Sequence, residues 1–333
     1  MTRVFWSHRD GEDCLRIEGV GESVTVEVRP YSAPAIEGLP SMAGRLVRDD
    51  GSADFVPRFA FAEGTPYSVV VGGVDVAVLT RPRPDVQATT EVIGIFPTST
   101  EVPRNLLRLY IWFSAQMSEG YVADHVRIVD VGGHEMVGVL LPSEHELWDG
   151  GRRRLTVLLD PARIKRGLVS HHEVGYPLAP GTSFRLVVDD TFCDARGIPL
   201  RGGAERHYEV GALERRRVEP DRWALTVPSS HTKEALSVAF ERPLDHGLLT
   251  RCLRVTDRGG QLVDGAPEVA PEERSWRFTP REPWVARPHA LVIDPLLEDL
   301  AGNSLSRVFD RDLTDAEDEP VEPVPRTIEF CPR

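Results

Sequence analysis

The sequence predicts an all-β protein built from several β-sandwich domains. Short runs of residues alternate apolar and polar side chains, and Gly, Pro or Asp separates these runs about every 10 to 20 residues. No long segment repeats its apolar residues at the 3.6-residue spacing of an amphipathic helix. With 333 residues, the chain is long enough for two to three domains that each bury a core.

The expected strands follow one another along the whole chain. Residues 23–30, "SVTVEVRP", alternate Val with polar residues, which is typical of a half-buried strand. Residues 66–80 give two strands around a Gly-Gly pair, which predicts a hairpin. Short helical turns are expected at 117–124 and 161–167. The other expected strands are 106–114, 125–133, 153–161, 183–190, 223–229, 235–243, 252–260, 275–282 and 289–295.

Two parts of the chain repeat each other. The segment "FSAQMSEGYVADHVRIVDVGGHEMVG" from Phe113 matches "FERPLDHGLLTRCLRVTDRGGQLVDG" from Phe240 without a gap, at a spacing of 127 residues. Further on, 184–200 matches 289–305 at a spacing of 105 residues. The first copy therefore carries an insertion of about 22 residues (127 − 105) between "RRLTVLL" and "YPLAPGTSF".

A weaker third copy lies at the N-terminus, where 53–71 resembles 276–293. The Pro- or Arg-rich stretches 80–90 and 213–223 carry few apolar residues, as linkers do. The acidic, Pro-rich C-terminal tail is expected to be extended or partly disordered, with "TIEF" able to dock as an edge strand. The expected division is into sandwiches 1–88, 89–216 and 217–312 and the tail 313–333.

Two quoted stretches carry a family resemblance. "FPTSTEVPRNLLRLYIWFSAQM" (96–117) and "LEDLAGNSL" (297–305) resemble the bacterial Ig-like domain family that occurs in tandem in surface-layer and other envelope proteins. The resemblance covers 91–312 as two copies and 1–88 weakly, and "FERPLDHG" lacks the family's Ser-x-Pro-Met. It implies three tandem Ig-like or fibronectin-like sandwiches that serve as spacers or as adhesive and docking modules.

Two acidic loops raise the question of a metal site. "CDARGIPL" (193–200) and "EDLAGNSL" (298–305) share an Asp, a Gly three residues later and a Leu three residues after that. Asn303 stands where the other copy has Ile198, which argues against a shared ligand set. We interpret both loops as turns of the repeated fold, in which Gly adopts positive φ. The other carboxylates at strand ends are interpreted as turn formers rather than calcium ligands.

Composition and motifs exclude several classes of function. The net charge of −13 argues against a nucleic-acid partner. No GxSxG, HExxH, GxxxxGK[ST] or GxGxxG motif occurs, so no catalytic residue and no cofactor are expected. No apolar run reaches the roughly 18 residues of a membrane span. The four Cys residues are far apart and are expected to be mostly free thiols.

The insertion holds the candidate binding residues. Basic and His side chains gather there although the chain is acidic overall, and loops on a rigid β scaffold are where binding residues concentrate. Adjacent His residues on an extended segment would point to opposite faces, so no metal site is expected. The candidate binding residues are Arg163, Lys165, Arg166, His171, His172 and Glu173.

We therefore expect a non-catalytic binding or scaffolding protein that docks a protein or a surface glycan through loops of the middle domain. One alternative is a carbohydrate-active or accessory enzyme subunit with a site between domains, and another is a structural spacer in a larger assembly. The compartment stays open. The charged N-terminus lacks a signal-peptide run, which indicates the cytoplasm if the chain is full length, whereas the family resemblance implies the cell envelope or secretion.

Overall fold

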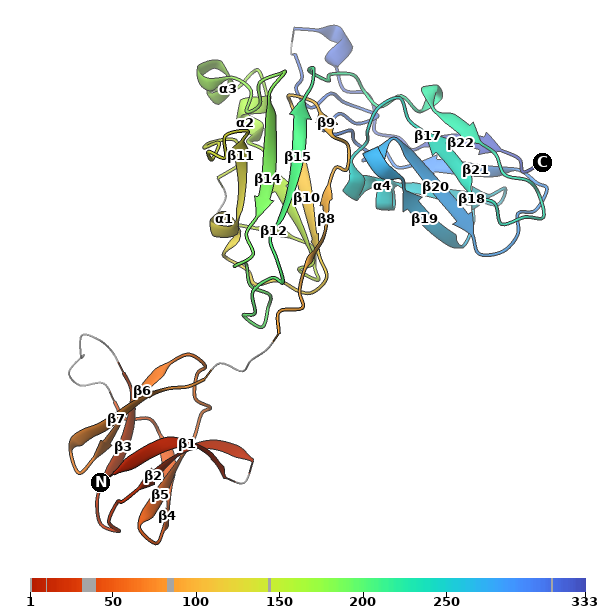
Figure 1. Cartoon of the computed structure of the whole chain (residues 1–333). Coiled ribbons are helices and arrows are strands. Elements are labelled where there is room, and N and C mark those ends of the chain that lie inside the picture. Colours follow the sequence, from red (N-terminus) through yellow and green to blue (C-terminus); the bar gives the residue numbers. More distant parts are fainter. Residues whose placement is uncertain (1, 10, 32–39, 83–86, 143–144, 313) are drawn as a thin grey trace. The chain divides into compact units, whose positions relative to one another are not determined.

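The computed structural model describes residues 2–9, 11–31, 40–82, 87–142, 145–312 and 314–333. The chain forms two compact units, Met1–Gln87 and Ala88–Arg333 (Figure 1). The first unit has one hydrophobic core and the second has two, one for each of its sandwiches. Residues 83–86 of the expected linker 80–90 lie outside the described residues.

In the part of the first unit that the structure describes, seven strands form a sandwich. Its sheets have the strand orders β1-β2-β5-β4 and β3-β6-β7, and alternate residues of β2 and β6 supply the core. The expected hairpin at 66–80 is confirmed as β6 and β7, which join through Gly72 and Gly73, both at positive φ. The strands are β1 (Arg3–Arg9), β2 (Glu12–Glu18), β3 (Val26–Pro30), β4 (Gly44–Asp49), β5 (Ser52–Pro57), β6 (Pro66–Val71) and β7 (Val74–Thr80).

The second unit begins with the middle sandwich, whose sheets have the orders β12-β13-β10-β8 and β11-β14-β15-β9. Its helices are short: α1 (Val122–His125), α2 (Pro161–Ile164) and α3 (Val169–Val174). Its strands are β8 (Val92–Phe96), β9 (Glu101–Val102), β10 (Arg108–Phe113), β11 (Val126–Asp130), β12 (Leu147–Trp148), β13 (Arg154–Leu158), β14 (Ser183–Val188) and β15 (Ala204–Val210).

The C-terminal sandwich has the sheet orders β16-β17-β20-β19 and β18-β21-β22. Besides α4 (His246–Cys252), it holds the 3-10 turns η1 (Pro220–Arg222), η2 (Pro271–Glu273) and η3 (Ala316–Asp318). Its strands are β16 (Ala224–Thr226), β17 (Leu236–Ala239), β18 (Leu253–Asp257), β19 (Gly265–Val269), β20 (Ser275–Pro280), β21 (His289–Ile293) and β22 (Arg326–Phe330).

The C-terminal strand β22 belongs to the sandwich and not to a separate tail. It pairs antiparallel with β21, and Phe330 is buried in the core. The last sandwich thus extends beyond the predicted boundary at residue 312, and "TIEF" forms the edge strand that the sequence allowed for. The acidic and Pro-rich residues between β21 and β22 interrupt the apolar pattern on which that boundary was based.

All three sandwiches share one topology. Numbered from the start of each sandwich, four strands pair in the order 1-2-5-4 and three in the order 3-6-7, and the middle sandwich adds the short strand β9. This is the strand order of a constant-type immunoglobulin domain. The predicted fold class, tandem Ig-like β-sandwiches, is therefore confirmed. The repeat spacing is kept as well, since β11 and β18 start 127 residues apart.

The two acidic loops have the geometry expected of fold turns. Oδ1 of Asp194 accepts hydrogen bonds from the N–H groups of Arg196 and Ile198, 2.8 and 3.1 Å away. In the second copy, Oδ1 of Asp299 accepts from Ala301 and Asn303, both at 2.9 Å. The glycine of each loop has positive φ, 77° in the first copy and 81° in the second. The carboxylates thus hold their own loops.

Candidate functional site

The insertion folds into two helical turns that pack on the middle sandwich. Asp160 caps α2 by accepting a hydrogen bond from the Ala162 N–H, and the buried Ile164 anchors the turn in the core. The second turn, α3, ends at Gly175 with φ of 76°. The expected helical turn at 161–167 is thereby confirmed for 161–164. The extended conformation expected for His171 and His172 is wrong, because both lie in α3.

Two of the six candidate residues hold the insertion together. The guanidinium of Arg163 donates to the carbonyls of Gly138, Gly175 and Tyr176 at 2.6 to 3.1 Å. Nδ1 of His171 lies 2.5 Å from the carbonyl oxygen of Arg163, and its ring packs edge-on against Tyr176. Their polar atoms are thus engaged within the insertion and the loop below it.

Two further candidates connect the insertion to the C-terminal sandwich. The N–H of Arg166 donates to Asp310, whose carboxylate is fully buried and also accepts from the Tyr176 hydroxyl at 2.5 Å. The Arg166 guanidinium lies 3.4 Å from Asp310 and 3.5 Å from Asp312, as ion pairs without the alignment of hydrogen bonds. Lys165 places its ammonium 4.6 Å from the centre of the Phe309 ring. The cationic cluster thus neutralises an acidic segment of the same chain.

The last two candidates are exposed. His172 and Glu173 lie on the outer face of α3. They are accompanied by three exposed apolar side chains, Leu168, Val169 and Val174. This outer face, 168–174 without His171, is an exposed part of the insertion that another molecule can contact.

A buried acid joins the two sandwiches of the second unit. Glu273 is 0% exposed. Its carboxylate accepts hydrogen bonds from the N–H groups of Thr98 and Ser99 and from the Thr98 hydroxyl, at 2.7 to 3.1 Å. His246, stacked on Phe96, adds a fourth contact with Nδ1 at 3.0 Å. Thr98, Ser99 and Phe96 belong to the middle sandwich, whereas Glu273 and His246 belong to the C-terminal sandwich. This carboxylate therefore binds across the interface between the two sandwiches, which we call the joint.

The backbone at Glu273 is a repeated feature of the fold, but its side chain is not. Glu273 has φ of 51° and its carbonyl accepts from the Leu244 N–H. In the middle sandwich, Arg152 has φ of 49° and accepts from Met117 in the same way. The left-handed residue therefore serves the sandwich fold in both copies. What is particular to the second copy is a carboxylate directed into the neighbouring sandwich.

A second acid, Asp245, makes another contact across the joint. It is 1% exposed and caps α4 by accepting from the Leu248 N–H at 2.9 Å. The hydroxyl of Tyr110, on β10 of the middle sandwich, donates to it at 2.8 Å. Arg108 Nε is 3.1 Å from Asp245 Oδ2, close enough for an ion pair but not aligned as a hydrogen bond, and Arg108 also pairs with Glu298. Burial, followed by the Asp245 charge, raises the pKa of Tyr110, so its hydroxyl keeps its proton.

A third acid, Asp299, lies in a groove of about 200 Å³ between the sandwiches, together with Glu214 and Arg242. Burial raises the pKa of Asp299 to about 6, although the Arg242 charge and Asn303 favour the ionised form. In the repeat counterpart Asp194, burial acts in the same direction, but hydrogen bonds from the backbone, Thr90 and Arg196 outweigh it and lower the pKa.

Glu214 and Asp299 resemble an acid–base pair because their pKa values shift in opposite directions. Burial opposes ionisation in both, but Arg216 and Arg242 lower the pKa of Glu214, whereas the pKa of Asp299 is raised. The groove, however, is smaller than the roughly 300 Å³ at which small-molecule pockets begin. The carboxylate of Asp299 already accepts from four groups: Arg242, Ala301 and the main-chain and side-chain nitrogens of Asn303. These acids are therefore better explained as parts of the joint than as catalytic groups.

Replacing Asp299 and Asp194 separately by Asn is expected to give opposite pH dependences of stability. Since the folded pKa of Asp299 is raised from 3.8 to about 6, its contribution is full below about pH 4 and lost as the pH rises through 6. The cost of Asp299→Asn should therefore be about 3 kcal/mol smaller at pH 7 than at pH 4.

The lowered pKa of Asp194 gives a contribution that is present above about pH 4 and lost on acidification. The cost of Asp194→Asn should therefore grow as the pH rises. Urea unfolding of the two variants and the wild type at pH 2.5, 4, 5.5 and 7 measures both slopes, because the Asp194 contribution changes below about pH 4 and the Asp299 contribution between about pH 4 and 6. Slopes of the same sign would contradict the assignment.

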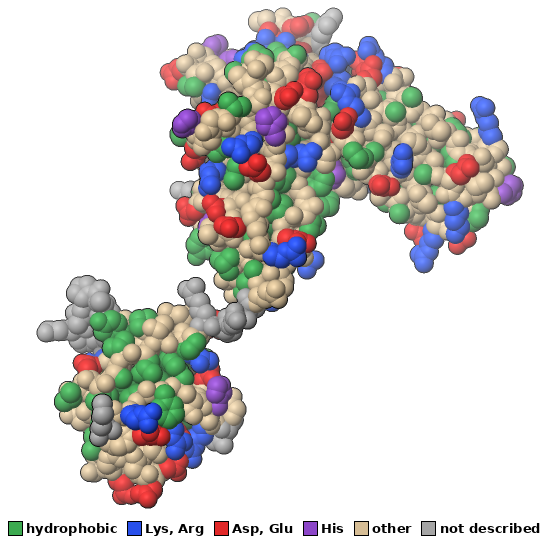
Figure 2. Space-filling view, in the orientation of Figure 1, with side chains coloured by type: hydrophobic (Ala, Val, Ile, Leu, Met, Phe, Trp, Pro, Cys, Tyr) green, Lys and Arg blue, Asp and Glu red, His purple; other side chains and the backbone are tan. Residues whose placement is uncertain are grey.

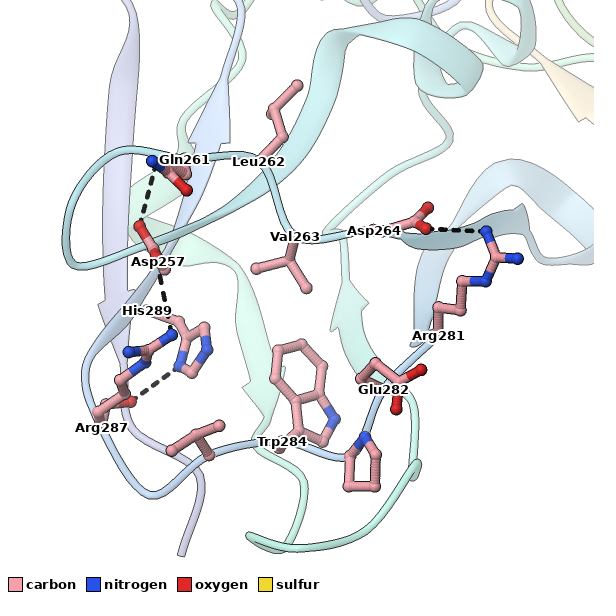
Figure 3. Close-up of a pocket in the computed structure, with 12 residues that line it drawn as sticks. Asp257, Gln261, Leu262, Val263, Asp264, Arg281, Glu282, Trp284, Arg287 and His289 are labelled. Atoms are coloured by element: carbon pink, nitrogen blue, oxygen red, sulfur yellow. Dashed lines mark hydrogen bonds and ion pairs between the residues drawn. The ribbon is translucent and has the colours of Figure 1, made fainter.

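A separate pocket of about 380 Å³ lies in the C-terminal sandwich, between the loop that follows β18 and the loop that joins β20 to β21 (Figure 3). Trp284 and Val263 form an apolar wall, and His289 lies beside them. Two ion pairs also line it, Asp257 with Arg287 at 3.7 Å and Asp264 with Arg281 at 3.1 Å. The sequence analysis did not single out this pocket.

The surface offers no large field of one sign on the face shown in Figure 2, where acidic and basic side chains lie intermixed over the second unit. No helix among the described residues is long and apolar enough to cross a bilayer. Within the same residues, no three His, Cys, Asp or Glu side chains are grouped as metal ligands would be. All four Cys residues are free thiols, and burial raises the pKa of Cys252 to about 11.

The strand order defines the class of protein as one of tandem Ig-like β-sandwiches. No protein-family model matches the chain, and no curated protein matches it. Among solved structures it is similar to the FN1-FN3 domains of chicken CNTN1, with 12% identity over 100% of this chain and 98% of that one and a TM-score of 0.24. A marsupial T cell receptor is similar at 6% identity over 100% and 99%, with a TM-score of 0.27.

An I-band fragment of titin is also similar, with 8% identity over 88% of both chains and a TM-score of 0.23. All three structures consist of Ig or fibronectin domains or contain them. Because these TM-scores are low, the assignment of the fold rests on the strand order of each sandwich.

Proposed function

We propose that the chain is a non-catalytic scaffolding and binding protein in which Ala88–Arg333 acts as one braced pair of Ig-like sandwiches. One observation carries this proposal: Glu273 and Asp245 are buried at the joint, each at 1% exposure or less, and the carboxylate of each is bound by groups from both sandwiches. Buried acids of this kind fix one arrangement of their partners, since any other leaves charged and polar groups unpaired.

The insertion supports the same proposal. Arg166 and Tyr176 bind Asp310 beyond the joint, so the extra helical turns act as a strut between the sandwiches. The docking role expected for the insertion passes to its outer face, where His172, Glu173 and three apolar side chains are exposed. The resemblance of 96–117 and 297–305 to the bacterial tandem Ig-like family fits a module of this kind.

Hydrogen exchange on the full chain tests the brace. The N–H groups of Thr98, Ser99 and Leu107 donate across the joint, to Glu273 and to the Leu300 carbonyl. We expect them to exchange on the order of 100-fold more slowly than the N–H of Gly133, which is bonded in a surface turn of the middle sandwich. Equally fast exchange at both places would mean that the sandwiches move independently and would refute the proposal.

A further inference from the structure

The pocket of the C-terminal sandwich exists because the second copy lacks the insertion. In the middle sandwich, the β13–β14 connection carries α2 and α3, and Arg163 fixes them to the carbonyl of Gly138. Gly265, the repeat counterpart of Gly138, starts β19 directly after the pocket residue Asp264. There the β20–β21 connection is short, and the space between the two loops stays open.

A histidine faces this space where the other copy has a phenylalanine. Phe184 of β14 and His289 of β21 are repeat counterparts, and each stacks on the facing residue of the next strand, Tyr208 or Phe330. His289 is 5% exposed, so an apolar ring would suit its surroundings. The imidazole thus adds polar atoms at a position where the fold itself requires only a ring.

The orientation of the imidazole is fixed. Nδ1 lies 2.8 Å from the Arg287 carbonyl oxygen, which only accepts, so Nδ1 carries the proton. Nε2 of the neutral ring is then an acceptor, and no described residue is its partner. The ring turns this edge toward Val263 and Trp284 (Figure 3). The indole N–H of Trp284 is bound by the Glu234 carbonyl, and the ring is 2% exposed, so Trp284 forms the buried apolar floor of the pocket.

Four of the five acidic and basic side chains that line the pocket form ion pairs. Asp257 faces Arg287, and Asp264 faces Arg281, so an ion between these pairs would meet little net field. Glu282, at the pocket edge, has no cationic partner among the described residues. Both pairs nonetheless keep unused donors and acceptors. A ligand with hydroxyl groups can donate to a carboxylate and accept from a guanidinium at once, while its carbon-bound hydrogens pack on the exposed side chains of Leu262 and Val285. A pocket of about 380 Å³ is at the small end of ligand sites.

We infer that this pocket binds a neutral, hydroxyl-rich ligand of monosaccharide size, with His289 Nε2 accepting one of its hydroxyl protons. The inference is independent of the brace between the sandwiches. If hydrogen exchange shows a rigid joint and no ligand binds, only the pocket proposal fails. If a ligand binds but the joint is not rigid, only the brace proposal fails.

Saturation-transfer NMR on the full chain tests the inference. The probes are the methyl glycosides of glucose, galactose, mannose and N-acetylglucosamine, followed by titration of the best one with tryptophan fluorescence as readout. We expect transfer to at least one glycoside and a loss of affinity of about tenfold or more in His289→Phe. His289→Phe should fold, since it restores the ring of the other copy, and thermal unfolding checks this.

The control is His207→Phe, an exposed position on β15 of the middle sandwich, which should bind as the wild type does. If His289→Phe fails to fold, Glu282→Gln at the pocket edge replaces it, with an expected loss of a few-fold. Absence of transfer to every glycoside, equal binding by a folded His289→Phe, or displacement of the sugar by equimolar phosphate or ethanolamine would overturn the inference.

Discussion

Replacing Glu273 by Ala is expected to lower the free energy of unfolding of the second unit by about 3 to 5 kcal/mol. The change leaves the N–H groups of Thr98 and Ser99 and the ring nitrogen of His246 without their partner at the joint. Each buried unsatisfied donor costs about 1 to 3 kcal/mol. The backbone is not the cause, because Ala and Glu are similarly disfavoured at positive φ.

The same variant should change how the second unit unfolds. Each of its sandwiches has its own core, and the joint is what couples them. In calorimetry we expect one cooperative transition for Ala88–Arg333 in the wild-type chain and two in Glu273→Ala.

The matched control is Glu272→Ala. Glu272 also has positive φ, but its side chain is exposed and only its N–H bonds to Thr98. This variant should stay within about 0.5 kcal/mol of the wild type. If both variants unfold alike, Glu273 does not hold the joint.

The fold could be predicted from the sequence because its signal is local. β11, β14, β18 and β21 alternate or run apolar over five or six residues, and the matching Gly-rich turns set the repeat. Strands without such a run were missed, among them β12, which has two residues. The edge strand at "TIEF" was expected, but the acidic segment before it led the domain boundary to be placed at residue 312.

The joint could not be predicted in the same way. Glu273 follows Pro-Glu in a polar turn, where the pattern is that of an exposed acid, and its partner Thr98 is 175 residues away. A signal was nevertheless present in the repeat comparison. Asp245 and His246 stand where the first copy has Ser118 and Glu119. Both residues contact the middle sandwich, through Tyr110 and Phe96. Departures between copies thus mark contacts that only one copy makes.

The insertion illustrates the opposite limit. Its basic residues were correctly found to be unusual in an acidic chain, but unusual charge does not say where the counter-charge lies. The guanidinium of Arg166 is paired with Asp310 and Asp312. Asp310 lies 144 residues further along the chain than Arg166. Only the fold brings these two segments together. The sequence alone therefore could not show that Arg166 is paired within its own chain.

Replacing Gly302 by Ala is expected to destabilise the second unit much more than replacing Gly197 by Ala. The two glycines are repeat counterparts with φ of 81° and 77°, so a side chain costs each about 1 to 2 kcal/mol of backbone strain. A Cβ at 197 would meet nothing within 4 Å, whereas a Cβ at 302 would lie 2.5 Å from Leu107 Cδ2. Overpacking should add about 1 to 3 kcal/mol.

This difference locates the clash at the joint, because Leu107 belongs to the middle sandwich and its N–H binds the Leu300 carbonyl. A double-mutant cycle with Leu107→Ala provides the check. Leu107→Ala alone should destabilise, but it should cost clearly less in the Gly302→Ala background, since it removes the atom that the new methyl meets. With Gly197→Ala the two costs should simply add. Additive costs at both glycines, measured by urea unfolding, would show that the joint does not press against Gly302.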